Sequence, residues 1–304
     1  MKIAILSNGT GNYSTKRLKE VALARGHDVK VIKYRECFAS IEKSNPVISY
    51  RGKELSGFDA IIPRIASNMT RYGTAIVRQM EMQEGTYSLS SSIAINRTRD
   101  KLRSTQLLAK AGVAIPKTVF SRNTTDIDSL IDAVGGVPVI IKLARGTHGN
   151  GVVLADSKRM AKSALQALYL HNEDGTNILV QEFIKESAGT DIRAFVVGGR
   201  VVASMKRQSL DDDFRSNLHK GGEGTIIKLT EEERKMAIKA TRAMGLSVAG
   251  VDMMRSARGP LVLEVNASPG FGIEGVTKRD VATPIIEHIE RNAKRRNKKD
   301  RVGA

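Results

Sequence analysis

The 304-residue sequence has one cysteine, no tryptophan and only 4% aromatic residues, and each scarcity argues against a class of protein. Because Cys37 is the only cysteine, no intrachain disulfide can form, and we expect a protein of the reducing cytoplasm. The few aromatic side chains leave little surface on which nucleic-acid bases can stack, which disfavours a dedicated RNA-binding protein. No run approaches the roughly 18 apolar residues of a membrane span, and the apolar start is too short for a signal peptide.

Acidic residues are also in deficit, with 32 Asp and Glu against 49 Lys and Arg, so the formal net charge is +17. Seven of the basic residues lie in a tail at 291–304, which contains a single acidic residue, Asp300. The tail contributes +6 and the rest of the chain +11, so the body is basic as well. Such a balance predicts attraction to anionic partners. The alternative is that the charge serves only solubility.

Residues 1–95 alternate between buried strands and amphipathic helices, which predicts a small Rossmann-like α/β domain. The runs "KIAILS" and "HDVKVIK" flank a helix for which we expect Ser14 or Thr15 as the N-cap and Gly26 as the stop. The turn "NGTGN" between them is similar to the start of a dinucleotide-binding fingerprint, but Ser14 stands where its third glycine belongs. We therefore expect no dinucleotide site there.

Two lysines lie where a lysine is unfavourable. Asp100 is the expected N-cap of a helix ending near residue 111, which puts Lys101 in the first turn, at the wrong end of the helix dipole for a cation. Lys142 interrupts the otherwise apolar strand "VPVIIKL". A buried cation needs a counter-charge, so both positions indicate a bound anion.

A glycine-rich loop, "GTHGNG", follows that strand and contains Gly146, Gly149 and Gly151. Successive backbone N–H groups in such a loop can bind phosphate. The loop is not a Walker A motif, because no Gly-Lys-Ser/Thr follows it.

Hard oxygen ligands are concentrated near the end of the chain. Glu264 and Asn266 alternate with apolar residues in "LVLEVN", so they point to the same face of a strand. The preceding run "VAGVDMM" contains Asp252, and the two runs are expected to form a hairpin. If Arg255 pairs with Leu261 across a five-residue loop, Asp252 lies opposite Glu264, with Cβ atoms roughly 5 Å apart.

Two carboxylates that close repel each other, and a divalent cation removes the repulsion. Oxygen donors from Asp, Glu and Asn suit Mg²⁺ or Mn²⁺, which commonly complete their shells with water and substrate phosphates. The alternative is a surface hairpin with solvated acids, which the apolar neighbours disfavour.

Seven stretches in order resemble the RimK family of the ATP-grasp superfamily: "RDKLRSTQLLAKAG", "GTHGNGVVLA", "VQEFIKE", "DIRAFVVG", "FRSNLHKGG", "VAGVDMMR" and "LEVNASPGF". The resemblance covers residues 1–290 and implies an α/β ATP-grasp fold with an N-terminal pre-ATP-grasp domain, 1–95. It also implies an ATP-grasp domain at 96–290, with lobes at about 96–179 and 180–290, followed by the basic tail.

The resemblance implies roles for individual residues. The positions that match nucleotide contacts are Lys101, Lys142, Gly146, Gly149, Gly151, Glu182, Phe183, Asp191, Arg215, Ser216 and Asn217. Asp252, Glu264 and Asn266 match the metal ligands, so ATP and Mg²⁺ or Mn²⁺, as two ions, are the expected cofactors. The stretch "SLDDD" before Phe214 and the basic tail depart from the family pattern and bear on the acceptor.

The family activity implied is ATP-dependent addition of L-glutamate to the acidic C-terminal tail of the sixth small-subunit ribosomal protein, through an acyl phosphate. Arg193 and Arg215 are the candidates for stabilising that acyl phosphate, and the glycine loop is expected to act as a lid. The resemblance also suggests a homotetramer without membrane attachment. Two alternatives stay open: a ligase for a small-molecule cofactor or amino-group carrier, and a basic RNA-binding protein that also binds nucleotide.

Overall fold

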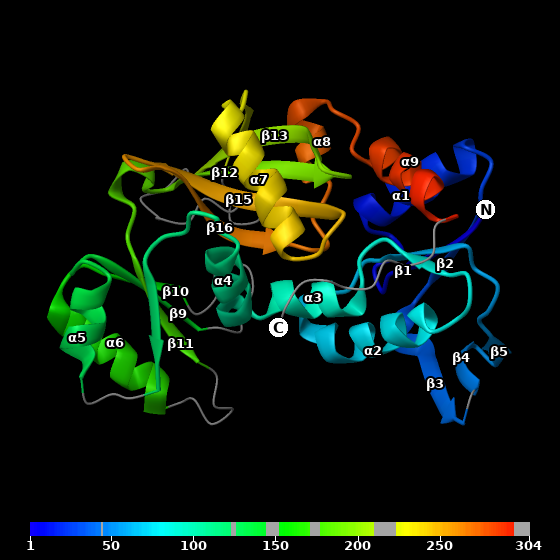
Figure 1. Ribbon diagram of the computed structural model, residues 1–304, viewed down its shortest axis with the longest axis horizontal. Coiled ribbons are helices and arrows are strands. Elements are labelled where there is room, and N and C mark those ends of the chain that lie inside the picture. The colour runs from blue at the N-terminus through cyan, green and yellow to red at the C-terminus, as the bar shows by residue number, and fades with distance from the viewer. Residues whose placement is uncertain (44, 123–125, 144–151, 171–176, 210–222, 295–304) are drawn as a thin grey trace.

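The computed structural model describes residues 1–43, 45–122, 126–143, 152–170, 177–209 and 223–294, which form four β-sheets with helices packed against them (Figure 1). The predicted glycine loop, the stretch containing Arg215, Ser216 and Asn217, and all but the first residues of the basic tail lie outside these ranges. Across the described ranges, no helix is both long enough and apolar enough to cross a bilayer.

The N-terminal sheet is parallel, as its apolar strands predict, with the order β2-β1-β6-β7. Alternate residues of β1 face opposite sides: Ile3 and Ile5 pack against α1 and α9, whereas Ala4 and Leu6 pack against α2 and α3. The elements are β1 (Lys2–Leu6), α1 (Tyr13–Ala24), β2 (Asp28–Ile32), β6 (Ala60–Pro63), α2 (Thr70–Glu81), β7 (Tyr87–Ser88), α3 (Ser92–Arg99) and α9 (Ala282–Asn292).

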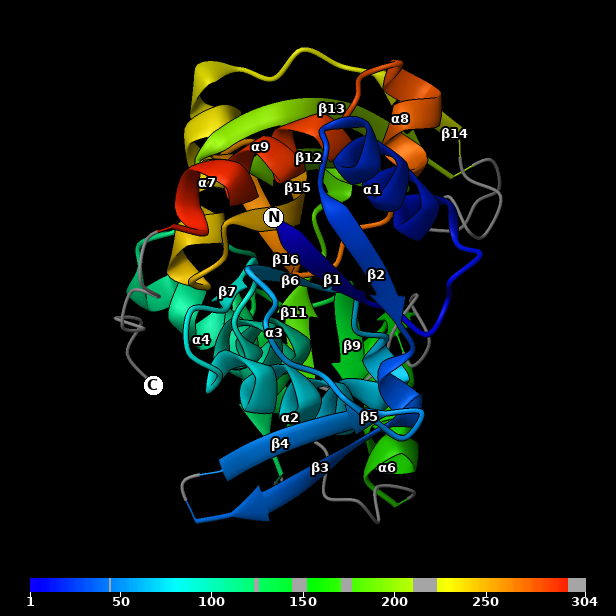
Figure 2. The same ribbon diagram turned by 90° about the vertical axis from the view of Figure 1, so that its right-hand side faces the viewer.

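The last described helix, α9, therefore covers a face of the first sheet and lies beside α1 (Figure 2). Its Ile285, Ile286 and Ile289 are buried in this layer. The two ends of the described chain thus share one core. The helix α3 also runs across the predicted boundary at residue 95, and the division into 1–95 and 96–290 stays a prediction.

The helix α1 begins two residues earlier than predicted, with Asn12 as its N-cap in place of Ser14 or Thr15. Both hydroxyls are used elsewhere: Thr15 shares a 3.0 Å hydrogen bond with Ser7, and Ser14 accepts one from an arginine described below. A Cβ at Gly9 would lie 2.1 Å from Nδ2 of Asn12, so any other residue at this position would require the Asn12 side chain to move.

An antiparallel sheet that the sequence analysis did not predict projects from the N-terminal domain (Figure 2). It buries Ile48 and Tyr50 against α2 but leaves Phe38 and Ile41 exposed, so its apolar pattern is too mixed to stand out in the sequence. Its strands are β3 (Cys37–Glu42), β4 (Asn45–Tyr50) and β5 (Lys53–Glu54).

The first half of the predicted ATP-grasp region is an antiparallel sheet with the order β10-β9-β11-β8, covered on one face by α5 and α6. It places Lys142 in β9, opposite Leu179 of β11. The elements are β8 (Thr118–Ser121), α5 (Ile127–Ala133), β9 (Val139–Leu143), β10 (Val152–Ala155), α6 (Lys158–Leu170) and β11 (Ile178–Glu182).

The second half is an antiparallel sheet with the order β14-β13-β12-β15-β16, and α7 packs on one face. A capping box of Thr230 and Glu233 starts α7, and Gly198 and Gly199, in the turn between two neighbouring strands, both have positive φ. The elements are β12 (Thr190–Val197), β13 (Arg200–Gln208), β14 (Glu223–Ile226), α7 (Glu231–Ala243), β15 (Val248–Ser256), β16 (Gly259–Asn266) and α8 (Gly272–Thr277). The helix α4 (Lys101–Lys110), from the first half, contacts α7 and strand β16 of this sheet.

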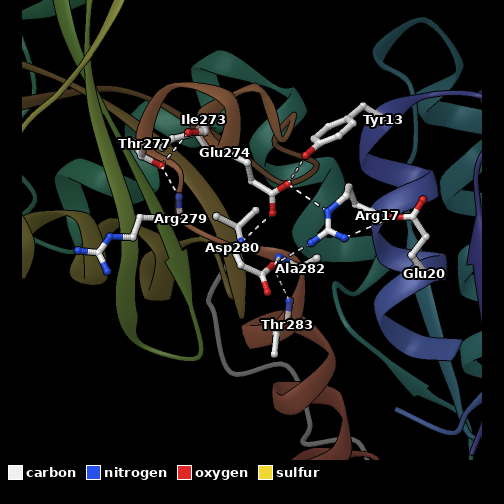
Figure 3. A network of polar contacts seen from close by, with 11 residues as sticks. Tyr13, Arg17, Glu20, Ile273, Glu274, Thr277, Arg279, Asp280, Ala282 and Thr283 are labelled. Carbon is white, nitrogen blue, oxygen red and sulfur yellow. Dashed lines mark hydrogen bonds and ion pairs between the residues drawn. The ribbon is translucent and has the colours of Figure 1, made fainter. Parts of the chain in front are cut away.

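A polar network ties α8 to the start of α1 (Figure 3). Glu274 is 7% exposed and accepts hydrogen bonds from the Tyr13 hydroxyl at 2.7 Å and the Val281 amide at 2.8 Å. Arg17 lies 3.4 Å from Glu274 and 3.5 Å from Asp280. This network holds the segment after β16 against the N-terminal domain.

Candidate functional site

A cavity of about 570 Å³ lies between the N-terminal sheet and the five-stranded sheet. One wall is the loops that follow β1 and β6, including Asn8, Gly9 and Arg64. The opposite wall is formed by polar side chains of β12, β13, β15 and β16, together with the segment that follows β16. Ligands of α/β proteins bind at the carboxyl ends of parallel strands, and the first wall is of this kind.

Asp252 lies directly opposite Glu264, as predicted, but the hairpin reaches this register differently. The predicted pairing of Arg255 with Leu261 is wrong, because Arg255 pairs with Pro260 and the turn has only two residues. A bulge at Leu263 supplies the missing residue and restores the register.

Asp252 is buried and bound by two arginines from neighbouring strands. Arg193 donates from Nε to Oδ1 at 2.7 Å and from Nη2 to Oδ2 at 2.6 Å, and Nη2 of Arg207 lies 3.0 Å from Oδ2. Burial alone raises the pKa of Asp252, but the charges of Arg193 and Arg207 outweigh it and hold this pKa below its ordinary value. The carboxylate is therefore kept ionised.

Asp191 belongs to the same group of charges. It lies opposite Arg207 in the β12–β13 pairing, and both of its oxygens accept hydrogen bonds from that guanidinium. It is only 6% exposed, and its predicted place near the ribose stays a prediction.

The three predicted metal ligands offer a donor set that fits a hard divalent cation. Glu264 is exposed, and no hydrogen bond or ion pair joins it to another described residue. Oδ1 of Asp252 accepts only one hydrogen bond from the described residues, which leaves an acceptor direction open. The side-chain amide nitrogen of Asn266 lies 3.4 Å from Oδ2 of Asp252. Rotation of this amide by half a turn would place its oxygen on the side of Asp252, where it can serve as a metal ligand. The described residues contain no group of three or more His, Cys, Asp or Glu side chains suited to a metal, so the amide is needed as third ligand.

The two unusual lysines meet beside Glu264. Lys142 donates to Oε1 of Gln181 at 2.9 Å, and burial together with the charge of Lys101 lowers its pKa to about 8, against the attraction of Glu264. Burial also lowers the pKa of Lys101, again opposed by Glu264. Two desolvated ammonium groups next to the carboxylate of a predicted metal ligand are suited to a phosphate chain, and their contact with ATP stays a prediction.

Glu182 joins the two ATP-grasp sheets. Its Oε1 accepts a hydrogen bond from the Lys117 amide at 2.6 Å, and it forms an ion pair with Arg258 in the β15–β16 turn. The next residue, Phe183, is partly exposed at the end of β11, between the two sheets. Their predicted contact with adenine is consistent with this place and stays a prediction.

The sequence analysis missed three arginines of this cavity: Arg64, Arg99 and Arg207. Arg64 had a recognisable signal, because it directly follows the buried strand "AIIP", at the end of a parallel strand where ligands bind. Arg99 and Arg207 had none, since each looks like an ordinary polar residue at the end of an element.

Two family models match the chain: "RimK PreATP-grasp domain" at residues 1–95 and "RimK-like ATP-grasp domain" at residues 98–289. A protein of Hydrogenovibrio crunogenus named "Probable alpha-L-glutamate ligase" is 54% identical over 302 residues, which is 99% of both chains. A protein of the same name from Nitrosococcus oceani is 55% identical over 296 residues, 97% of both chains.

Solved structures share the fold. The ATP-grasp ligase PsnB, complexed with minimal precursor, Mg and ADP, superposes with a TM-score of 0.73 at 19% identity, covering 97% of this chain and 98% of PsnB. A RimK domain ATP-grasp protein from Sphaerobacter thermophilus gives a TM-score of 0.70 at 19% identity, covering 95% of this chain and all of that one. The predicted ATP-grasp fold with an N-terminal pre-ATP-grasp domain is confirmed.

Proposed function

Because the chain belongs to the RimK family of ATP-grasp ligases, we propose that it adds L-glutamate to the C-terminus of a small-subunit ribosomal protein, the sixth. It is an ATP-dependent ligase, and the names of relatives matched over nearly the whole chain support glutamate as the amino acid joined. The observation that carries the chemistry is the pairing of Asp252 with Glu264 beside Lys101 and Lys142.

Each part of the phosphate site has a task. Lys101 and Lys142 bind and neutralise the ATP phosphates, while Asp252, Glu264 and Asn266 would hold Mg²⁺, or Mn²⁺, as one or two ions. When bound, the metal neutralises charge that develops on the transferred phosphoryl group.

The reaction has two steps. The acceptor's terminal carboxylate oxygen attacks the γ-phosphorus, ADP leaves, and an acyl phosphate forms. The amine of glutamate then attacks the carbonyl carbon, phosphate leaves, and an amide forms as the nitrogen loses its proton. Nη1 of Arg193 makes no hydrogen bond with the described residues, so it is available to stabilise the acyl phosphate. Arg215, outside the described residues, remains the second candidate.

The net charge of +17 supports an acidic protein tail as the acceptor, since basic surface attracts it. We also infer from the family resemblance a cytoplasmic homotetramer. A small-molecule cofactor or amino-group carrier is the second candidate acceptor.

The test is mass spectrometry of the purified ribosomal protein after incubation with the enzyme, ATP, Mg²⁺ and each amino acid in turn. We expect mass increments of glutamyl residues with glutamate alone, located at the C-terminus. A ribosomal protein with an amidated C-terminus should stay unmodified. Glutamylation of a small acceptor but never of the protein would refute the proposed acceptor.

A further inference from the structure

A second group of positive charges lines the cavity on the side of the N-terminal domain. Arg64 follows β6, its Nη2 donates to Oγ of Ser14 at 3.0 Å, and its guanidinium lies 5.3 Å from the centre of the Phe271 ring. Arg99 ends α3, and its Nη2 donates to the Ile65 carbonyl at 2.7 Å. Among the described residues, neither arginine forms an ion pair with an aspartate or glutamate.

The two cations are largely shielded from water and from counter-charge. Burial, together with the charge of Arg99, lowers the pKa of Arg64 to about 10. Burial also lowers the pKa of Arg99, against the attraction of Glu264. Nε of Arg99 is buried without a hydrogen-bond partner among the described residues. Half-buried guanidinium groups without an ion-pair partner are unfavourable, so a ligand anion is expected to complete this group.

The start of α1 adds further donors at the same place. The N-cap Asn12 makes no side-chain capping hydrogen bond, and the first turn contains no acidic residue. Both Asn12 and Ser14 line the cavity. Free N–H groups at a helix start favour an anion, and here they lie beside the Arg64 guanidinium that is bonded to Ser14.

The position of this second group of positive charges relative to the predicted phosphate site indicates which anion it binds. Arg99 lines the same cavity as Arg64 and Glu264, and the pKa values show that its charge acts on Arg64 and that Glu264 acts on it, so it lies near both. The acceptor carboxylate must reach the phosphate at the metal site, whereas the incoming amino acid must approach with its amine and keep its own carboxylates away from that phosphate.

We propose that Arg64, Ser14 and the first turn of α1 bind a carboxylate of the incoming amino acid, and that Arg99 separates this carboxylate from the metal site. This assignment rests on the proposed glutamate-ligase function. It makes Arg64 a specificity-determining residue: its contact with the Phe271 ring helps to hold the guanidinium, which can then bind a carboxylate with two parallel hydrogen bonds.

The test compares wild type with Arg64→Gln, which keeps a donor for Ser14, and with Arg64→Lys, which keeps the charge. Arg71→Gln, on the exposed surface of the same domain, is the matched control. We expect Arg64→Gln to raise KM for glutamate about 10-fold or more, with KM for ATP and for the acceptor within about 2-fold of wild type. Arg64→Lys should show a smaller rise, and Arg71→Gln none.

Amide analogues identify the carboxylate. L-glutamine lacks the side-chain carboxylate and isoglutamine lacks the main-chain carboxylate. With the analogue that lacks the group bound by Arg64, wild type and Arg64→Gln should perform equally. If the variant is impaired equally with both analogues, or if its KM for glutamate equals that of wild type, the assignment is wrong.

A binding measurement separates this inference from the proposed function. The melting temperature of the full chain is measured with Mg²⁺ and a non-hydrolysable ATP analogue, with and without glutamate. Glutamate should raise the melting temperature of wild type and Arg71→Gln but not that of Arg64→Gln. Glutamate binding of this kind without transfer to the ribosomal protein would refute the proposed acceptor and keep the subsite. Absence of a glutamate shift in wild type would overturn the subsite.

Discussion

Asp252 and Glu264 lie directly opposite each other on β15 and β16, but of the two only Asp252 forms ion pairs with other described residues. Arg193 and Arg207 hold the buried Asp252 carboxylate, whereas Glu264 is exposed. The two carboxylates of the predicted metal pair therefore differ in their structural importance. In the proposed metal site, Asp252 would offer an oxygen to the metal and also pair with two arginines of the fold, whereas Glu264 would serve the metal alone.

The first prediction separates these two roles. Both Asp252→Ala and Glu264→Ala should weaken Mg²⁺ binding about 10-fold or more, because each removes a ligand. Only Asp252→Ala should destabilise the fold, by about 3–5 kcal/mol, since it leaves the Arg193 guanidinium unpaired and removes one of the two carboxylates that bind Arg207. Chemical denaturation gives the free energy of unfolding, and the Mg²⁺ dependence of turnover gives the metal affinity.

Asn266→Asp is the matched control for the metal, because an oxygen donor survives at this position. Its Mg²⁺ requirement should change less than that of Glu264→Ala. Wild-type turnover of Glu264→Ala at limiting Mg²⁺ would remove Glu264 from the metal site.

The second prediction concerns Lys142, a cation largely removed from water without an ion-pair partner among the described residues. Lys142→Met keeps the volume of the stem and removes the charge. The melting temperature without ATP should be unchanged or higher, because no charge is then desolvated. The ATP-induced rise in melting temperature should shrink, matching a Kd about 10-fold higher or more. Lys110→Met, on the exposed end of α4, should behave as wild type, and an equal ATP-induced rise in both variants would exclude Lys142 from the phosphate site.

The third prediction is a pH dependence from the same lysine. Its pKa of about 8 lies below the ordinary 10.5, and bound phosphates should raise it, so ATP binding above pH 8 requires uptake of a proton. The Kd for ATP should therefore be flat below about pH 8 and rise above it by up to about 10-fold per pH unit. Lys142→Arg stays charged and should bind ATP with a flat profile; a rise of equal slope in this variant would point to another group.

Without ATP, the free energy of unfolding should increase as the pH rises, whereas ATP binding becomes weaker. The folded-state pKa of Lys142 is the lower one, so between about pH 8 and 10.5 the unfolded chain holds more protons. The contribution of this group to the free energy of unfolding therefore rises with pH across that window. In Lys142→Met this component should be absent, which denaturation at several pH values can check.

The sequence predicted those parts of the fold and site that depend on local pattern. Apolar runs located β1, β6, β9 and β15, and the alternation of Glu264 with Asn266 located the metal face. The register that brings Asp252 to Glu264 was right although the turn was wrong, because the bulge at Leu263 offset the shorter loop. A bulge is a local departure from the pleat that apolar alternation does not show.

The arginines of the cavity could not be brought together from the sequence for a different reason. Arg64 follows the end of a strand and Arg99 ends a helix, and only the tertiary contact between the end of α3 and the loop after β6 brings them to one cavity. Arg207 reaches Asp191 through a second register shift, between Phe195 and Val196. Without that shift, the tight turn at Gly198 and Gly199 would pair Asp191 with the neighbour of Arg207.

The last prediction concerns the charge of +17 and its basic tail. If the acceptor is a protein tail that gains a negative charge with each glutamate, basic surface should attract it and speed encounter. Exposed charges are screened over roughly 8 Å at physiological salt, so KM for the protein acceptor should rise steeply with salt. KM for ATP, which depends on the metal site and the shielded Lys101 and Lys142, should rise much less.

Deletion of residues 293–304 tests the tail separately, since it removes six basic residues and one acidic residue. The truncated enzyme should show a higher KM for the protein acceptor and a shallower salt dependence, with KM for ATP unchanged. The deletion begins one residue after α9 ends at Asn292, so the helix that covers the N-terminal sheet is kept and the melting temperature should not move. An acceptor KM and salt slope equal to those of the full chain would show that the tail serves solubility alone.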